Sequence, residues 1–210
     1  MARRSEHSLE EIREMVLSAA ETIVVEEGFA ALKVRKIAMD IGYTVGSVYM
    51  VFDNMADLIT HIKARTLNDI AEQLQKVSDD GDPQRCILEL AQAYLTFASQ
   101  HFNRWSMIFE HRVAEDAVSP PWYQQKIDVL FKPLETHIKR LKPESSERQV
   151  RRAARAMWGG IHGVCILSLT GKLDAVGIHD VENTLRLLVE NFLRGWTDAP
   201  ESDEPIPENQ

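Results

Sequence analysis

Apolar residues recur every three or four positions along most of this chain, a spacing that places them on one face of an α-helix. Glycines, prolines and clustered polar residues interrupt the pattern and mark where one helix stops and the next starts. The pattern predicts an all-α fold of about nine helices. The expected helices cover residues 9–27, 34–41, 45–52, 54–77, 83–100, 104–112, 121–141, 147–170 and 180–197.

The first helices carry clear start and stop signals. Ser8 and Glu11 have the spacing of a capping box, and Gly28 ends the apolar run that follows them. Gly42 separates the two short helices with a tight turn, and Thr44 is placed to cap the second of them. These signals predict a small three-helix domain at the N-terminus.

Breaks in the pattern divide the chain into three parts. Residues 1–57 are expected to form the small N-terminal domain, and residues 58–197 a larger helical domain. Residues 198–210 are acidic, contain three prolines and are expected to be a disordered tail.

The two short helices have the residue spacing of a helix-turn-helix. Ala38 is small enough to let the helices approach each other, and Gly42 supplies a left-handed turn. Val48, ten positions after Ala38, packs back against the first helix. The inner face is completed by Ile37, Ile41 and Phe52. Two short core helices can produce the same spacing by chance, so the spacing alone leaves that interpretation open.

If the motif is a helix-turn-helix, the outer face of its second helix is short enough to enter the major groove of DNA. That face carries Val45, Gly46, Ser47, Tyr49 and Met50. Arg35 and Lys36 lie alongside on the preceding helix. The arrangement favours DNA binding as the function of the N-terminal domain.

The longer sequence around the motif resembles the DNA-binding domain of the TetR family of bacterial regulators. The resemblance rests on VRKIAMDIGYTVGSVYMVFDNMADLI, residues 34–59, and on the preceding AAETIVVEEGFAAL. It implies a dimeric and usually repressing protein that binds a palindromic operator in double-stranded DNA and is released by a small-molecule effector. Further on, MWGGIHG, residues 157–163, resembles the Trp-His-Gly pattern of one C-terminal subtype of that family, in a helix that helps form the dimer.

The resemblance also implies roles for individual residues. Tyr49 would contact a phosphate, and Ser47 and Arg35 would lie near base edges. Thr44 would cap the recognition helix and reach the DNA backbone. The chemistry agrees, because hydroxyl groups donate to phosphate oxygens and arginine can bond guanine with two hydrogen bonds.

The charge of the N-terminal domain departs from the family pattern. Val45 and Met55 stand where the family usually has lysines that meet phosphates. Among residues 1–57, six basic side chains face ten acidic ones, for a formal charge of −4. This acidity is the main argument for the alternative that the protein is a helical interaction module that has lost DNA binding.

Basic residues are nevertheless concentrated near the motif, so orientation can compensate for the net charge. Lys33, Arg35 and Lys36 cluster next to it, and Arg3 and Arg4 can act as a basic arm. The other interpretation of each is a solvated side chain at a helix face or a chain terminus.

Aromatic residues are frequent between residues 97 and 131. Each can be an ordinary core residue, but together they exceed what three modest helices need for packing. Small-molecule sites are typically lined by aromatic groups with a few polar ones, and the resemblance places the family's ligand pocket in this region. The candidate effector-binding residues are Trp105, Phe109, Trp122, Tyr123 and His162. A hydrogen-bonded structural role is the other interpretation of His162.

The last two predicted helices are apolar on more than one face, which a single chain cannot bury in a two-layer bundle. Dimerisation explains this surplus, with both helices meeting their symmetry mates in a four-helix bundle. The candidate interface residues are Trp158, Leu185, Leu188, Phe192 and Trp196. The segment 58–197 is therefore expected to bind the effector and to form a homodimer.

The net charge and the absence of certain motifs argue against several other functions. The net charge of −8 argues against indiscriminate nucleic-acid binding. The sequence lacks the Gly-rich phosphate loop, HExxH and GxSxG motifs and paired cysteines, so neither an enzyme nor a cofactor is predicted. His101 and His111 flank a short helix without a nearby third ligand, so no metal site is expected.

The expected location is the cytoplasm. Residues 1–7 run into no apolar segment of the kind a signal peptide needs. Cys86 and Cys165 lie in apolar helical contexts, which predicts reduced core thiols. The longest uncharged run, residues 156–171, is shorter than the roughly 20 apolar residues of a membrane span.

Overall fold

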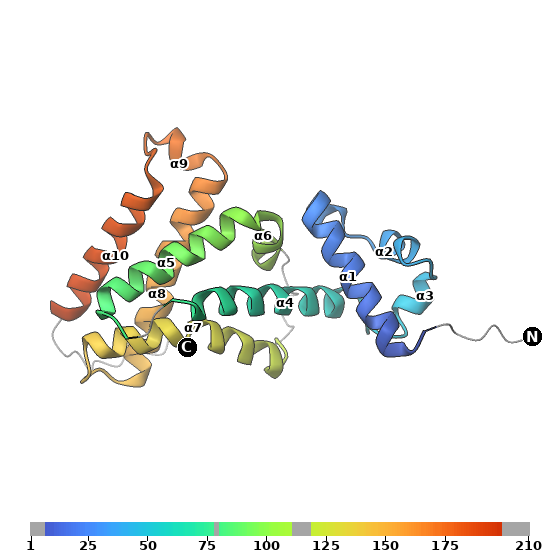
Figure 1. The fold of residues 1–210 in the computed structure, drawn as a ribbon, viewed down its shortest axis with the longest axis horizontal. Coiled ribbons are helices and arrows are strands. Elements are labelled where there is room, and N and C mark those ends of the chain that lie inside the picture. Colours follow the sequence, from blue (N-terminus) through green and yellow to red (C-terminus); the bar gives the residue numbers. More distant parts are fainter. Residues whose placement is uncertain (1–6, 78–79, 111–118, 199–210) are drawn as a thin grey trace, which may run out of the picture. The chain divides into compact units, whose positions relative to one another are not determined.

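A computed structural model of the chain describes residues 7–77, 80–110 and 119–198. All regular structure within these residues is helical, as the sequence predicted (Figure 1). The elements are α1 (Leu9–Glu27), the 3-10 helix η1 (Phe29–Ala31), α2 (Val34–Asp40), α3 (Val45–Val48), α4 (Met55–Gln75), α5 (Pro83–Gln100), α6 (Phe102–Glu110), α7 (Pro121–Leu141), α8 (Glu147–Leu169), α9 (Lys172–Ala175) and α10 (Val181–Asp198).

The predicted caps fix the ends of the N-terminal helices. The backbone N–H of Glu11 donates to Ser8 Oγ at 3.2 Å, and the Ser8 N–H donates to Glu11 Oε2 at 2.6 Å, which completes the capping box. Thr44 Oγ1 accepts from the backbone N–H of Ser47 at 3.2 Å at the start of α3. Gly42 has a φ of +73°, the left-handed turn that the motif requires.

Three elements differ from the prediction, and the first is the single-turn 3-10 helix η1, which follows Gly28 and was not predicted. The α-helical part of α3 ends at Val48 instead of residue 52, and turns continue the chain, with the Phe52 N–H donating to the Val48 carbonyl at 3.2 Å. The short helix α9 was not predicted, because four residues are too few to show a helical period. It begins directly after Gly171, whose φ of +69° ends the preceding helical segment.

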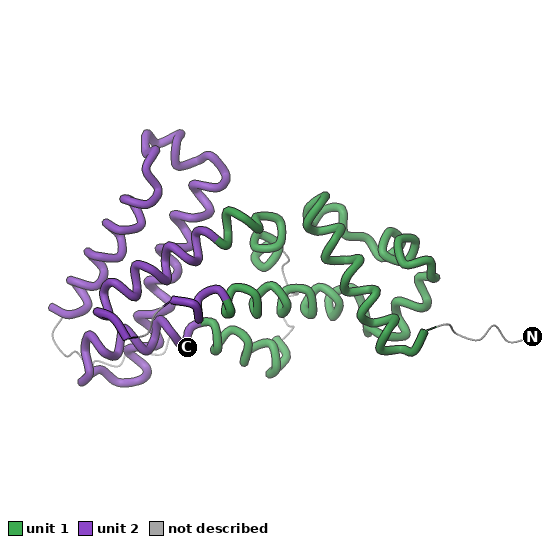
Figure 2. The backbone as a smooth tube through the Cα atoms, viewed as in Figure 1, with its two compact units in different colours: residues 1–72, 97–130 green, residues 73–96, 131–210 purple. Residues whose placement is uncertain are grey.

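The chain forms two compact units (Figure 2). Unit 1 contains residues 1–72 and 97–130, and unit 2 contains residues 73–96 and 131–210. Unit 1 thus includes α6 and most of α4 together with the N-terminal helices. The reason is that α6 packs against α1 and η1. The domain boundary predicted from the sequence followed residue 57 and was based on expected function.

The core of unit 1 is built on the inner face of the helix-turn-helix. Ile37, Ala38, Val48 and Phe52 are all buried, as the spacing predicted. They share one hydrophobic cluster with the apolar face of α1 and with Met107 of α6. Residues 44–52, called the recognition segment below, therefore rest on a continuous core, which leaves their other face exposed.

Unit 2 is centred on the packing of α8 against α10. Leu185, Val189 and Leu193 form the buried stripe of α10. A Cβ atom at Gly160 would lie 3.0 Å from Leu188 Cδ2, so glycine permits the close approach of the two helices there. No helix within the described residues is long and apolar enough to cross a membrane.

Both cysteines are buried and neither forms a disulfide. Burial raises the pKa of the Cys165 thiol to about 12, so its thiolate is scarce at neutral pH.

Candidate functional site

The exposed side chains at the second half of the helix-turn-helix are hydroxyl-bearing or apolar, and none is charged. Residues 44–52 contain no charged side chain. Tyr49 is 44% exposed and Met50 is 67% exposed, and Met39 of α2 is 73% exposed. Ser47 Oγ lies 3.0 Å from Thr44 Oγ1 at the start of α3. The segment offers hydroxyl groups and apolar side chains to a partner.

The predicted cations divide into three groups. Lys33, the residue before α2, and Arg35 within it are exposed. Lys36 forms an ion pair with Glu27 of α1, which partly neutralises its charge. Arg3 and Arg4 lie outside the described residues. Among the described residues, Lys33 and Arg35 are therefore the predicted cations that carry their charge at an exposed position, and the role of all five in DNA binding stays a prediction.

Val45 and Met55 both pack, partly buried, against the core of unit 1. Their side chains therefore contribute to the hydrophobic core of unit 1.

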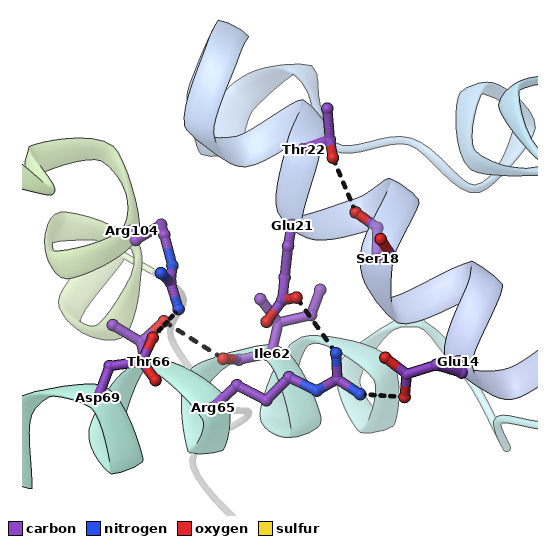
Figure 3. Close-up of polar contacts among 9 residues, drawn as sticks. All are labelled: Glu14, Ser18, Glu21, Thr22, Ile62, Arg65, Thr66, Asp69 and Arg104. Atoms are coloured by element: carbon purple, nitrogen blue, oxygen red, sulfur yellow. Dashed lines mark hydrogen bonds and ion pairs between the residues drawn. The ribbon is translucent and has the colours of Figure 1, made fainter. Parts of the chain in front are cut away.

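Ion pairs hold α1 to α4 within unit 1 (Figure 3). Arg65 of α4 donates to Glu14 Oε2 at 2.5 Å and to Glu21 Oε2 at 3.2 Å, so that one guanidinium joins two turns of α1. The hydrogen bond from Arg65 lowers the pKa of Glu14. The same pairing raises the pKa of Arg65. The orientation of α1 is thereby tied to that of α4.

The helix α6 is tied to the same framework. Arg104 of α6 donates to Asp69 Oδ2 of α4 at 2.5 Å (Figure 3). Asn103 Nδ2 donates to the Val25 carbonyl of α1 at 2.9 Å. A displacement of α6 would therefore act on both α1 and α4.

Four of the five candidate effector residues lie in unit 1. Trp105 is fully buried and its ring centroid is 5.6 Å from that of Phe109, which is 41% exposed. Trp122 is half-buried and stacks on His61 of α4, with ring centroids 4.7 Å apart. Burial raises the pKa of Tyr123.

His162, the fifth candidate, lies in unit 2. Its Nδ1 atom is 3.2 Å from the Tyr94 hydroxyl, and its ring stacks on Trp158 at a centroid distance of 5.2 Å. Burial lowers the pKa of His162 and favours its neutral form. These contacts agree with the structural interpretation of this histidine and do not test effector binding.

The candidate interface residues are largely packed within their own chain. Leu185 is buried, and Leu188 packs on Gly160. Trp158 also contacts Phe131 edge to face, at 5.7 Å between centroids. Phe192 and Trp196 are half-buried.

Two apolar side chains of α8 and α10 are more exposed than the candidates. Leu167 is 42% exposed and Leu187 is 63% exposed. Ala156 and Gly159 are exposed on α8 as well.

Two family models match the chain. The model of bacterial regulatory proteins of the tetR family matches residues 16–62, which include α2 and α3. The tetracyclin repressor-like C-terminal domain matches residues 87–192, just over half of the chain. The chain belongs to the TetR family. The Trp-His-Gly subtype is not singled out by these matches and stays a prediction.

Individual relatives of this TetR-family chain are distant. An uncharacterized HTH-type transcriptional regulator of Mycobacterium tuberculosis is 25% identical over 164 residues, which cover 78% of this chain and 73% of the relative. A protein of unknown function from Rhodococcus sp. RHA1 has a TM-score of 0.71 at 18% identity, over 93% of this chain and 98% of the other. The transcriptional regulator FadR of Bacillus subtilis, in complex with stearoyl-CoA, has a TM-score of 0.61 at 14% identity, over 87% and 98% of the two chains.

Family membership makes this TetR-family protein a DNA-binding transcriptional regulator and not an enzyme. Proteins of the family generally respond to small-molecule ligands. Among the residues that the structure describes, no group of three or more potential ligands is arranged to hold a metal ion.

Sequence reasoning missed Arg13 of α1, which contacts both the end of the recognition segment and α4. Arg13 Nη1 donates to the Val51 carbonyl at 2.6 Å, and Nη2 donates to His61 Nε2 at 2.8 Å. The partners lie 38 and 48 positions away in the sequence. Helical spacing and capping signals act over a few residues and cannot predict contacts at such separations.

Proposed function

We propose that this TetR-family regulator is a cytoplasmic repressor that binds a palindromic operator as a homodimer and is released by a small-molecule effector. The observation that carries the proposal is the recognition face of residues 44–51, which is exposed opposite a buried core. In the proposal Tyr49 and Thr44 supply hydroxyl groups for phosphate, and Ser47 supplies a hydroxyl for base edges. Arg35 supplies the group that can bond guanine, and Lys33 a positive charge beside it.

Further residues extend this interface in the proposal. Val45 lies at its edge, and Lys36 joins it where Glu27 releases the ion pair. Arg3 and Arg4 form a basic arm. Met50 offers an apolar group for the methyl of thymine.

The effector is proposed to contact Trp105, Phe109, Trp122, Tyr123 and His162. Aromatic side chains favour a ligand with substantial apolar surface. The complex of Bacillus subtilis FadR with stearoyl-CoA gives an example of such a ligand bound by this fold. Native mass spectrometry of the purified protein tests this part, because a co-purifying molecule with no apolar portion contradicts it.

The dimer is proposed to form through α8 and α10, with Trp158, Leu188, Phe192 and Trp196 shaping the interface and Leu185 supporting α10 from within. The Trp-His-Gly subtype is proposed for the C-terminal domain on the residues 157–163. Exposed Leu167 and Leu187 add apolar surface on the same two helices.

Operator binding is tested by a gel shift with the DNA that flanks the protein's own gene, together with selection from a random duplex library at fixed salt. The proposal expects one palindromic sequence to be enriched. If the protein binds no selected duplex more tightly than random DNA, the alternative of a helical interaction module is favoured. The −4 charge of residues 1–57 motivates that alternative.

Replacement of Tyr49 by phenylalanine is expected to weaken operator binding by about 1 to 2 kcal/mol, because it removes one hydroxyl from a phosphate contact. Sequence preference should be kept, since a phosphate contact does not read bases. Fluorescence anisotropy at fixed salt measures the change. Equal affinities for wild type and Tyr49→Phe would exclude Tyr49 as a phosphate contact.

The double replacement Val45→Lys and Met55→Lys is expected to make binding more sensitive to salt. Two added phosphate contacts per protomer give up to four per dimer, which steepens the slope of log affinity against log salt by up to about 3.6. Affinity is measured across a salt series. Val129→Lys, at a 51% exposed position of α7, controls for the added charge. An unchanged slope shows that neither position approaches phosphate.

A further inference from the structure

The recognition segment ends in a carbonyl group that is held from another helix. The α-helical part of α3 comprises Val45–Val48, so its own hydrogen bonds do little to fix its direction. At the end of the segment, the Val51 carbonyl accepts a hydrogen bond from Arg13 Nη1 at 2.6 Å. Arg13 belongs to α1, and its guanidinium carbon lies 4.3 Å from the centroid of the Phe52 ring. Arg13 thus contacts the segment twice, by a hydrogen bond to Val51 and by a cation–π contact with the face of the Phe52 ring.

The second half of the Arg13 guanidinium is held by His61 of α4. Arg13 Nη2 donates to His61 Nε2 at 2.8 Å. A guanidinium has only donors, so His61 can accept this bond only while Nε2 carries no proton. Protonation of His61 would remove the acceptor and place a second cation against Arg13.

His61 is in turn covered by α7. The Trp122 ring stacks on the imidazole with an interplanar angle of 16°, and Phe52 meets it edge to face at 5.7 Å. Trp122 lies in the first turn of α7, a region proposed above for effector binding. A change at Trp122 therefore reaches the Val51 carbonyl through two intermediate side chains.

We propose that Arg13 is a positioning residue for the recognition segment, and that neutral His61, covered by Trp122, holds Arg13 in the DNA-binding arrangement. The proposal rests on the proposed DNA-binding function and adds a route by which α7 acts on it. Protonation of His61 releases Arg13 and loosens residues 49–52, and displacement of Trp122 makes that protonation easier because it exposes the imidazole to water.

The charges around His61 set the direction of the pH effect. Burial lowers the pKa of His61, and the positive charges of Arg13 and Arg65 lower it further, while Asp57 Oδ1, 3.4 Å from Nε2, opposes them. The net effect keeps His61 neutral at pH 7. The contribution of Arg13 is complete above the ordinary pKa of histidine and is lost as the pH falls through the lowered pKa.

The test compares operator affinity at pH 7.5 and pH 5.5 within each variant, by anisotropy with the duplex selected at pH 7.5. His61→Gln retains an acceptor oxygen but does not titrate in this range. Over this interval we expect the wild type to lose about tenfold more affinity than His61→Gln. The reason is that protonation of His61 removes one charge-assisted hydrogen bond, from Arg13 to His61. His179→Gln, at an exposed histidine of unit 2, should keep the wild-type pH dependence. Identical pH dependence in wild type and His61→Gln would overturn the proposal.

A second variant tests the contact with α7. Trp122→Ala removes the ring that buries His61, so the pH at which affinity falls should rise toward the ordinary pKa of histidine. An unchanged midpoint contradicts the role of Trp122.

Amide hydrogen exchange without DNA separates this inference from the proposed function. Arg13→Lys keeps the positive charge. A single ammonium group cannot replace the two guanidinium nitrogens that reach the Val51 carbonyl and His61 at the same time. Exchange over residues 45–52 should be faster in Arg13→Lys than in the wild type at pH 7.5, with exchange in α8 unchanged. Equal exchange over residues 45–52 would overturn the proposal even if the protein binds its operator. A wild type that binds no duplex would refute the proposed function and leave the exchange result decisive for Arg13.

Discussion

Replacement of Leu187 by arginine is expected to convert the proposed homodimer into a folded monomer. Leu187 is 63% exposed on α10, so it contributes little to the core of its own chain. Burial of a leucine stabilises by about 1.5–3 kcal/mol, and a two-fold axis doubles this to about 3–6 kcal/mol per dimer. At 1.4 kcal/mol per factor of ten, the dimer should weaken by about 10² to 10⁴-fold.

Sedimentation at micromolar concentration measures the effect, with circular dichroism to show that the helices remain. Val129→Arg is the matched control, because Val129 is 51% exposed on α7 and lies outside the proposed interface. A Leu187→Arg variant that sediments as a dimer would show that α10 does not form the interface through this face.

Operator binding should fall together with dimerisation. A monomer reaches one half-site only, and the effective concentration of the second recognition helix is lost. The loss should be large here, because few basic residues flank the recognition segment and Lys36 is paired with Glu27. A monomeric variant with wild-type affinity for the palindrome would contradict the proposed mode of binding.

Local signals allowed much of unit 1 to be predicted from the sequence. Capping by Ser8 and Thr44 and the turn at Gly42 depend on neighbours within four residues, and all three are present in the structure. The inner face of the motif was also correct, because helical spacing determines which side chains share a face. The extent of α3 was not, since the tight turns after Val48 keep apolar side chains inward without continuing the α-helix.

Contacts between segments that are distant in the sequence could not be predicted from local sequence patterns. The bond from Arg13 to Val51 and the ion pairs of Arg65 join helices whose relative placement comes from tertiary packing. The ion pair of Lys36 with Glu27 was missed as well, because Glu27 lies nine positions away on another helix.

The apolar stripe of α10 was assigned to the dimer interface, yet Leu185 is buried within its own chain. Periodicity identifies an apolar face but does not say which partner covers it. Leu187 lies off that stripe and therefore gave no signal, although it is among the exposed large apolar residues.

Replacement of Trp105 by alanine is expected to cause the largest loss of stability of any single change considered. Trp105 has no exposed surface, and its ring contacts Phe102 and Phe109 at centroid distances of 6.1 and 5.6 Å. Removal of a buried tryptophan side chain costs about 3–5 kcal/mol, the sum of lost burial and of the cavity that remains. Denaturant unfolding of wild type and variant measures the difference in the free energy of unfolding.

The matched control is Phe109→Ala in the same helix. Phe109 is 41% exposed, so its truncation should cost about 1 kcal/mol or less. The pair separates the two interpretations of Trp105, because a ring that lines an open pocket already borders empty space and loses fewer contacts on truncation. If Trp105→Ala costs no more than Phe109→Ala, the ring faces such a pocket. If it costs several kcal/mol more, Trp105 is a core residue, and an effector can reach it only when α6 moves.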